Sequence, residues 1–317
     1  TEFGTNYVGI DGNLHFERCF ALKKYINNLL TGGYMVLESL LNPLRAEKKP
    51  WEMFFIGAVY SSVAILLSLW IFKDQTSLIM VFLTVMACIP IVYSTMKLEE
   101  SKDLSILDER ALMREHNKAI IFLMFLFFGI TVSFVFWYVF IPPDMLGFVF
   151  DKQIATIQAI NNKVSGNAYE QFGIFSKIFF NNVKVLSFSV LFAFIYGAGA
   201  IFILTWNASV IGTAIGNFVR VNLSEYAGLL GFDKFASYLN IFSLGLLRYA
   251  LHGIPEIMAY FYGGLAGGII SVAIAKKHYK DKKFSHILFD ASELLIIAMA
   301  FLLVAAFIEV YLTPIFF

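Results

Sequence analysis

Charge and proline are both scarce in this chain. Only 15% of its 317 residues are charged and seven are proline, whereas a soluble globular domain carries about 25% charged residues. The net charge is +1, which gives no overall attraction to nucleic acid. These absences argue against an ordinary soluble domain and against a nucleic-acid-binding protein.

Cysteine is rare, and the motifs of several common enzyme classes are missing. Cys19 lies in a polar region and Cys88 in an apolar run, so neither a disulfide framework nor a cysteine metal site is indicated. HExxH and Walker-type loops are absent, and five scattered histidines make a poor zinc site. We therefore expect no metal and no cofactor, and an enzyme is the less favoured class.

Long apolar stretches dominate what is present. The chain is 59% hydrophobic with 35 phenylalanines, and a helix needs about 20 apolar residues to cross a bilayer. Spans are predicted at residues 53–72, 78–96, 119–141, 183–205, 256–275 and 287–310. The shorter segment 208–221 is either a further span or a re-entrant helix. The sequence thus predicts an all-α, polytopic transmembrane helical bundle of about seven spans with interfacial helices.

Composition divides the chain into four regions. Residues 1–52 form an N-terminal extension, in which Met35 resembles a natural start and residues 1–34 are either an added upstream segment or an interfacial helix. Residues 53–141 hold three spans and a charged cytoplasmic hairpin, 97–118. The hairpin is expected to be solvated, with partner docking as the alternative. Residues 142–182 are expected to be interfacial on the outer face, and residues 183–317 form the membrane core.

Basic residues predict the orientation of a multi-pass protein in the lipid bilayer. Lysine and arginine gather in 35–52, 97–118 and 276–286, and such loops usually face the cytoplasm. Seven crossings put all three on one side, with the N-terminus inside and the C-terminus outside. A re-entrant 208–221 would place the last loop outside.

The most unusual stretch is His252-Gly253-Ile254-Pro255-Glu256. Proline disfavours helix in the residue before it and suits the first turn of a new one, so a broken helix is expected at 252–256. Arg248, His252 and Glu256 recur at intervals of four. His252 and Glu256 are candidates for a proton-responsive or ion-coordinating pair, and the alternative is that they pin the helix to a neighbour.

Other polar groups near the membrane could join this pair in one polar core. Glu309 lies near the end of the last span, either at the outer headgroup level or deeper, where it would need a partner such as Arg248 or His252. For the asparagines of this set, interhelical hydrogen bonding is the plainer interpretation. The full predicted polar core is Asn181, Asn182, Asn207, Asn217, Arg248, His252, Glu256 and Glu309. Small residues that permit close helix packing are Gly197, Gly199, Gly212, Gly216, Gly263, Gly264, Gly267 and Gly268.

Three blocks within roughly residues 175–317 resemble the stage II sporulation protein M family. The most specific is the HGxxE block at 252–256, followed by Gly263, Gly264 and Gly267. The others are Asn181-Asn182 with Gly197, Gly199, Asn207, Gly212 and Gly216, and the closing Ile308-Glu309 and Thr313-Pro314. Ala208 stands where the family pattern has glycine. The first three spans are similar to archaeal-type members.

The resemblance implies a helical membrane fold whose polar core is formed by these blocks. It also implies a scaffold, since the bacterial namesake assists membrane migration during engulfment together with peptidoglycan-degrading partners. Our first hypothesis is a non-enzymatic scaffold or a channel- or transporter-like unit, a homodimer packed through small-residue faces, with another membrane or cell-envelope protein as a further partner. The alternative is an intramembrane enzyme that uses His252 and Glu256 as acid and base on a lipid or peptide.

Overall fold

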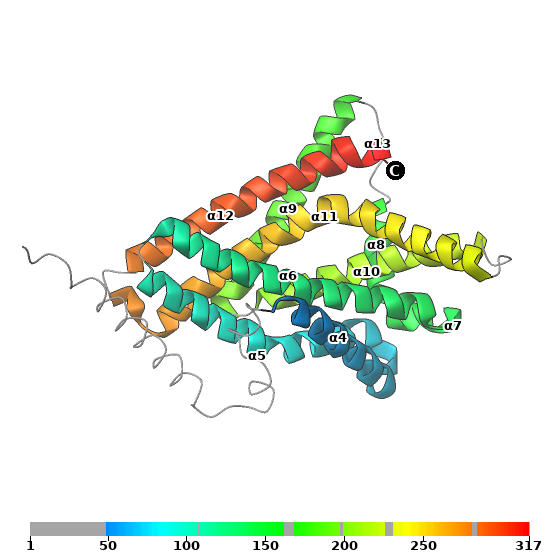
Figure 1. Ribbon diagram of the computed structural model, residues 1–317, viewed down its shortest axis with the longest axis horizontal. Helices are drawn as coiled ribbons and strands as arrows, with labels where there is room; N and C mark the ends of the chain where they lie inside the picture. Colours follow the sequence, from blue (N-terminus) through cyan, green and yellow to red (C-terminus); the bar gives the residue numbers. More distant parts are fainter. Residues whose placement is uncertain are drawn as a thin grey trace, which may run out of the picture. The chain divides into compact units, whose positions relative to one another are not determined.

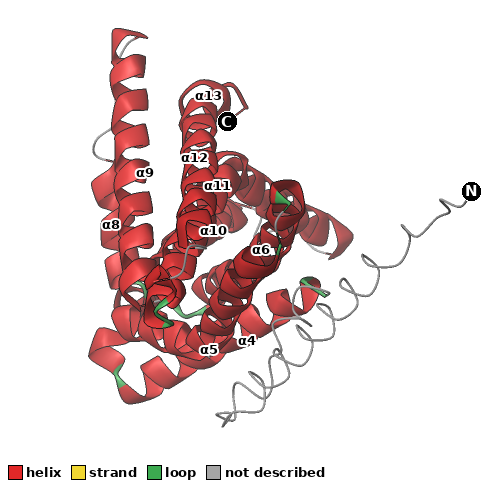
Figure 2. Cartoon of the chain, turned by 90° about the vertical axis from the view of Figure 1, so that its left-hand side faces the viewer, coloured by secondary structure: helices red, strands yellow, loops and turns green. Residues whose placement is uncertain are grey.

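The computed structural model describes residues 49–106, 108–161, 168–196, 199–225, 231–280 and 284–316. The chain divides into two compact units, 1–42 and 43–317, and every described residue belongs to the second. Over the described residues the chain forms helices and turns without strands (Figure 2). The expected extension 1–52 lies outside the described residues except for 49–52.

Within the described residues, seven long helices form the fold and short helices connect them. The long helices are α4 (Trp51–Ile71), α5 (Thr76–Ser105), α6 (Glu109–Phe140), α9 (Ala168–Tyr196), α10 (Ala200–Glu225), α11 (Gly231–Ala275) and α12 (Phe284–Phe307). The short elements are η1 (Lys73–Gln75), α7 (Pro143–Val149), α8 (Asp151–Asn161), η2 (His278–Lys280), the π-helix η3 (Ile308–Leu312) and α13 (Thr313–Phe316).

The prediction of seven spans is confirmed by length and composition. Each long helix contains a stretch apolar enough to cross a membrane. Residues 208–221 belong to the span Ala200–Asn222, so the full-span interpretation holds. The predicted fourth span, 183–205, is wrong in its bounds because the chain turns between Tyr196 and Ala200. At that turn Gly199 approaches the carbonyl oxygen of Phe192 too closely for any side chain.

The predicted broken helix at 252–256 is wrong. Helix α11 continues through Gly253 and Pro255 without interruption, although Figure 1 shows the long helix changing direction near its middle. Proline removes one backbone hydrogen bond and commonly bends a helix. Helices within membranes tolerate proline because neighbouring groups compensate for the lost bond.

Helices α6, α10 and α11 form the centre of the bundle. Helices α4 and α5 lie on one side of them, and α9 and α12 lie on the other (Figures 1 and 2). The connecting helix α8 is anchored by the buried side chain of Gln153, whose Nε2 donates to the carbonyl of Ser77 (3.0 Å) and to Oγ of Ser209 (3.2 Å). The connection 142–161 is thus tied to α5 on one side and to α10 in the centre.

Small residues bring these helices together within one chain. Gly212 and Gly216 of α10 face Phe134 and Tyr138 of α6, respectively. Gly263 and Gly267 of α11 both face α9, and Gly264 faces Ala200. Gly268 is buried on the same helix, whereas Gly197 lies outside the described residues. The small-residue faces that motivated a homodimer are therefore occupied by helices of the same chain.

The sequence analysis missed the closest of these contacts. Gly57 of α4 lies against the backbone of Leu126 and Ile130, and Gly129 of α6 lies against the backbone of Phe54. A side chain at either glycine would collide with main-chain atoms, which cannot move aside as a flexible side chain can. These two glycines therefore fix the distance between α4 and α6.

Candidate functional site

Glu256 of α11 is an ionisable residue that lies inside a candidate membrane span. The hydroxyl of Tyr260, one turn further along the helix, donates to Oε1 of Glu256 at 2.7 Å. Tyr260 is fully buried and Glu256 is half-buried. A carboxyl group at membrane depth is costly and usually faces protein or a polar cavity, so the phenol supplies one of the hydrogen bonds that Glu256 needs.

Glu309 reaches the same region from the end of the last span. It lies in the π-helix η3, which packs against both α9 and α11, and it is near enough to Glu256 and Tyr260 for an electrostatic interaction with both. Single-turn π-helices are rare and occur frequently at functional positions. The hydroxyl of Thr313 donates to the carbonyl of Ile308 at 3.1 Å, which satisfies one acceptor of this widened turn.

Asn182 of α9 lies level with these groups. Helices α9 and α11 run in parallel, with Gly263 facing Leu186 and Gly267 facing Val190. Asn182 comes one turn before Leu186, which places it beside the turn of α11 that holds Tyr260. It is buried, and its Nδ2 has no hydrogen-bond partner among the described residues. We call Asn182, Glu256, Tyr260 and Glu309 the carboxylate site.

The remaining residues of the predicted polar core do not all join this site. His252 is half-buried one turn before Glu256 on the same face of α11, and the side chain of Arg248 lies outside the described part of the chain. Asn181 is exposed on α9. Asn207 is half-buried on α10, while Asn217 is exposed there and accepts a hydrogen bond from the Tyr138 hydroxyl at 3.3 Å.

A second polar cluster lies where a solvated hairpin was predicted. The side chains of Glu99, Asp103 and His116 are fully buried, so the prediction of a solvated hairpin is wrong for these residues. His116 Nδ1 lies 2.7 Å from Glu99 Oε2. Its Nε2 lies 3.0 Å from Asp103 Oδ1, close enough for an ion pair but outside hydrogen-bonding geometry.

Lysine completes this half of the cluster. Lys102 Nζ donates to Glu99 Oε1 at 2.7 Å, and its side chain is almost entirely buried. His116 in its charged imidazolium form pairs with both acids that face it. Glu99 thus has a cation at each carboxylate oxygen, which is the arrangement that makes burial of a charge tolerable.

The other half of the cluster joins α5 to the end of α11. Glu100 is buried, and its two oxygens lie 2.6 Å from Lys276 Nζ and 2.6 Å from His278 Nδ1. Between these two residues the backbone of Lys277 adopts φ 63°, a left-handed conformation usually left to glycine. This turn directs both flanking side chains to one carboxylate.

We call these charged residues the ion-pair network. Its members are Glu99, Glu100, Lys102, Asp103, His116, Lys276 and His278. Figure 1 shows the end of α5, the start of α6 and the orange end of α11 gathered at the left of the view. Next to it, the Tyr262 hydroxyl donates to Asn117 Oδ1 at 2.6 Å and joins α11 to α6. Within the described chain, no three acidic, histidine or cysteine side chains are arranged to hold a metal ion.

Sequence reasoning missed several polar residues that a spacing argument could have found. Tyr260 lies four residues after Glu256, and Lys102 lies three after Glu99, which places each pair on one helix face. Arg220 was also missed. Its Nη1 donates to the carbonyls of Tyr138 (3.1 Å) and Ile141 (2.9 Å), where α6 ends. The long-range partners of Glu100 had no sequence signal.

These features define a multi-pass α-helical membrane protein with polar groups inside its bundle. The chain belongs to the stage II sporulation protein M family, whose model matches residues 119–314. The matched region runs from the body of α6 to α13 and includes the whole carboxylate site. No curated protein and no solved structure matches the chain.

Proposed function

We propose that the chain is a non-enzymatic membrane scaffold. The observation that carries this proposal is the ion-pair network, in which buried carboxylates pair with cations from other helices and so join them. Glu100 connects α5 to the turn after α11, and Glu99 connects α5 to α6. Charges that fix the ends of three spans in place suit a rigid unit on which other membrane proteins assemble.

Family membership supports the same function. The bacterial namesake of the family is a membrane-embedded partner of envelope enzymes, and such a role needs a stable helical surface. The exposed apolar side chains of the spans, such as Trp70 and Ile296, offer such a surface to another membrane protein. A second copy of the chain is the other candidate, through faces different from those filled by Gly212, Gly216, Gly263 and Gly267.

The orientation follows from the basic residues. We infer that the end bearing the ion-pair network faces the cytoplasm, because Lys276, Lys277 and Lys280 lie there. In intact cells, a cysteine at exposed position Lys118 is then expected to resist an impermeant thiol reagent. Labelling from outside would show that the protein has the opposite orientation.

A channel- or transporter-like unit is the second candidate, and the carboxylate site favours it. The site combines two carboxyl groups with a buried amide nitrogen that has no hydrogen-bond partner among the described residues, all at membrane depth. Ionisable groups there often mark proton or ion paths. The intramembrane-enzyme alternative rests on His252 and Glu256 alone. We prefer the scaffold because Tyr260 and Glu256 belong to the same helix. Their hydrogen bond therefore forms without any movement of one helix against another.

Flux measurements separate these functions. The full chain is reconstituted in phospholipid vesicles, and proton and potassium fluxes are followed with entrapped dyes. A scaffold is expected to leave both fluxes at the level of empty vesicles. A flux that disappears in Glu256→Gln but persists in Glu293→Gln, a matched change outside the site, would establish the channel-like function instead.

A positive test uses photo-cross-linking amino acids placed at Trp70 and Ile296 in native membranes. A scaffold is expected to give discrete protein adducts at one of these positions. Adducts with lipid alone at both would count against assembly through these faces.

A further inference from the structure

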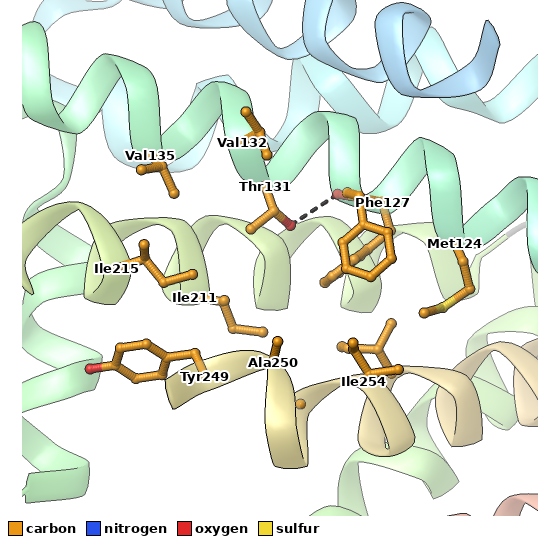
Figure 3. Close-up of a pocket in the computed structure, with 13 residues that line it drawn as sticks. Met124, Phe127, Thr131, Val132, Val135, Ile211, Ile215, Tyr249, Ala250 and Ile254 are labelled. Atoms are coloured by element: carbon orange, nitrogen blue, oxygen red, sulfur yellow. Dashed lines mark hydrogen bonds between the residues drawn. The ribbon is translucent and has the colours of Figure 1, made fainter. Parts of the chain in front are cut away.

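A pocket lies at the centre of the bundle, between α6, α10 and α11. Figure 3 shows α6 above it and α11 below it, with Met124 and Tyr249 towards its two ends. All three helices contribute residues that fall within predicted spans, among them Phe127, Ile211 and Ile254. The pocket therefore lies at the depth of the hydrocarbon core of a bilayer.

The walls of the pocket are apolar. The one hydroxyl in the middle of the wall, that of Thr131, donates to the carbonyl of Phe127 at 2.9 Å and is thereby satisfied (Figure 3). The phenol oxygen of Tyr249 points away from the other labelled side chains in the same view. Such walls offer a ligand dispersion contacts and no hydrogen-bond donor, which suits a hydrocarbon.

Gly253 opens the pocket on the side of α11. It is buried, yet a Cβ atom built on it would meet no atom within 4 Å. Most of the other buried glycines in α10 and α11 face a neighbouring side chain or backbone within 3 Å. Glycine weakens a helix interior relative to alanine, and here it leaves space that no part of the described chain fills.

We propose that this pocket binds the hydrocarbon chain of a membrane lipid. Ile254 lines the pocket and is also 38% exposed, and Leu247 on the same helix is 51% exposed. The pocket is thus continuous with the apolar surface that α11 presents to the bilayer. Since lipid tails are the medium at this depth, a tail is the occupant that can enter without dehydration of a polar group.

The opposite end of the pocket is closed. Val135, Ile215, Val219 and Ile241 form a buried apolar cluster, against which Tyr249 packs. A tail that enters beside Ile254 would end at this cluster. It would then fill the gap between α6 and α11, which have few direct contacts with one another, and it would join the two helices. This binding site does not depend on whether the chain is a scaffold or a channel.

Photolabelling of the full chain tests this proposal. The protein is reconstituted in phosphatidylcholine vesicles that contain a phospholipid with a diazirine in one acyl chain, and labelled peptides are mapped by mass spectrometry. Labelling is expected at pocket residues such as Met124 and Phe127. In Gly253→Leu the new side chain occupies the pocket, and labelling there should fall by about tenfold.

Gly173→Leu is the matched control. Gly173 is also a helical glycine with no atom within 4 Å of a built Cβ, but it lies on α9 away from the pocket. Both substitutions add the same side chain and raise helix propensity equally. The control should keep wild-type labelling of the pocket.

Three results would overturn the proposal. The first is absence of label from the pocket residues in the wild type. The second is equal labelling of the pocket in wild type and Gly253→Leu. The third needs a photo-cross-linking amino acid at Met124, and it is an adduct with a segment of residues 1–48 or with a second copy of the chain in place of lipid.

Discussion

The two polar regions of this protein handle buried carboxylates in opposite ways. In the ion-pair network, Glu99 faces Lys102 and His116, and Glu100 faces Lys276 and His278. In the carboxylate site, Glu256 accepts a hydrogen bond from a neutral phenol and lies near a second carboxyl group. One region balances its carboxylates with cations, and in the other a carboxylate accepts a hydrogen bond from a neutral hydroxyl group.

This difference separates a structural role from a candidate functional one. A carboxylate that pairs with cations from other segments joins those segments to its own helix. Removal of one partner leaves the other charge buried and unpaired, which destabilises the fold strongly. A carboxyl group that is held by a neutral donor of its own helix does not join two helices in this way.

The largest expected effect is at Glu99. Glu99→Gln removes the negative charge that faces Lys102 and His116, and loss of one partner of a buried ion pair costs about 3–5 kcal/mol. Chemical denaturation in mixed micelles measures the change in the free energy of unfolding. Lys118→Gln, which affects only an exposed pair with Glu115, should cost less than ~1 kcal/mol. Equal losses in the two variants would remove the contrast on which this account depends.

An uncharged contact provides the next comparison. Gly129→Ala places a methyl group against the backbone of Phe54, so α4 and α6 must separate, at a cost of about 1–3 kcal/mol. Gly173→Ala, where no neighbour lies in reach, should instead stabilise the chain by up to ~1 kcal/mol. The same denaturation experiment measures both. A neutral Gly129→Ala would show that this contact relaxes freely.

A modest gain is expected at the turn after α11. Lys277→Gly relieves a left-handed backbone at φ 63°, which is worth about 1 kcal/mol. Lys277→Ala removes the same charge without relieving the backbone and should not stabilise. If both variants gain alike, the benefit comes from the lost lysine charge and not from the backbone.

The smallest effect is expected at Glu256. Glu256→Gln keeps the oxygen that accepts from Tyr260, and among the described side chains no cation is paired with Glu256. The free energy of unfolding should therefore change by less than ~1 kcal/mol. A loss as large as that of Glu99→Gln would contradict the distinction between the two regions.

Composition predicted the fold class well because apolar segments indicate a lipid environment and charged segments indicate an aqueous one. Apolar length alone identified the spans, and the basic stretches favoured seven crossings. The error at 183–205 arose because Trp206 and Asn207 look like a break, although they lie inside α10. The turn depends on Gly199 and its approach to Phe192, a tertiary contact that no sequence window contains.

The site was predicted in part for a related reason. Asn182, Glu256 and Glu309 are polar residues within apolar runs, which is a local signal. The buried state of Glu99, Asp103 and His116 is not local, because a charged hairpin looks solvated until another helix covers it. This burial places the greatest expected loss of stability in the ion-pair network.

A double-mutant cycle between Glu100 and Lys276 tests the central claim most directly, since these residues join α5 to the end of α11 over 2.6 Å. The free energy of unfolding is measured for wild type, Glu100→Gln, Lys276→Gln and the double variant. If charge clamps the two helices, the coupling energy should be about 1–3 kcal/mol. Additive losses, with no coupling beyond error, would contradict the claim.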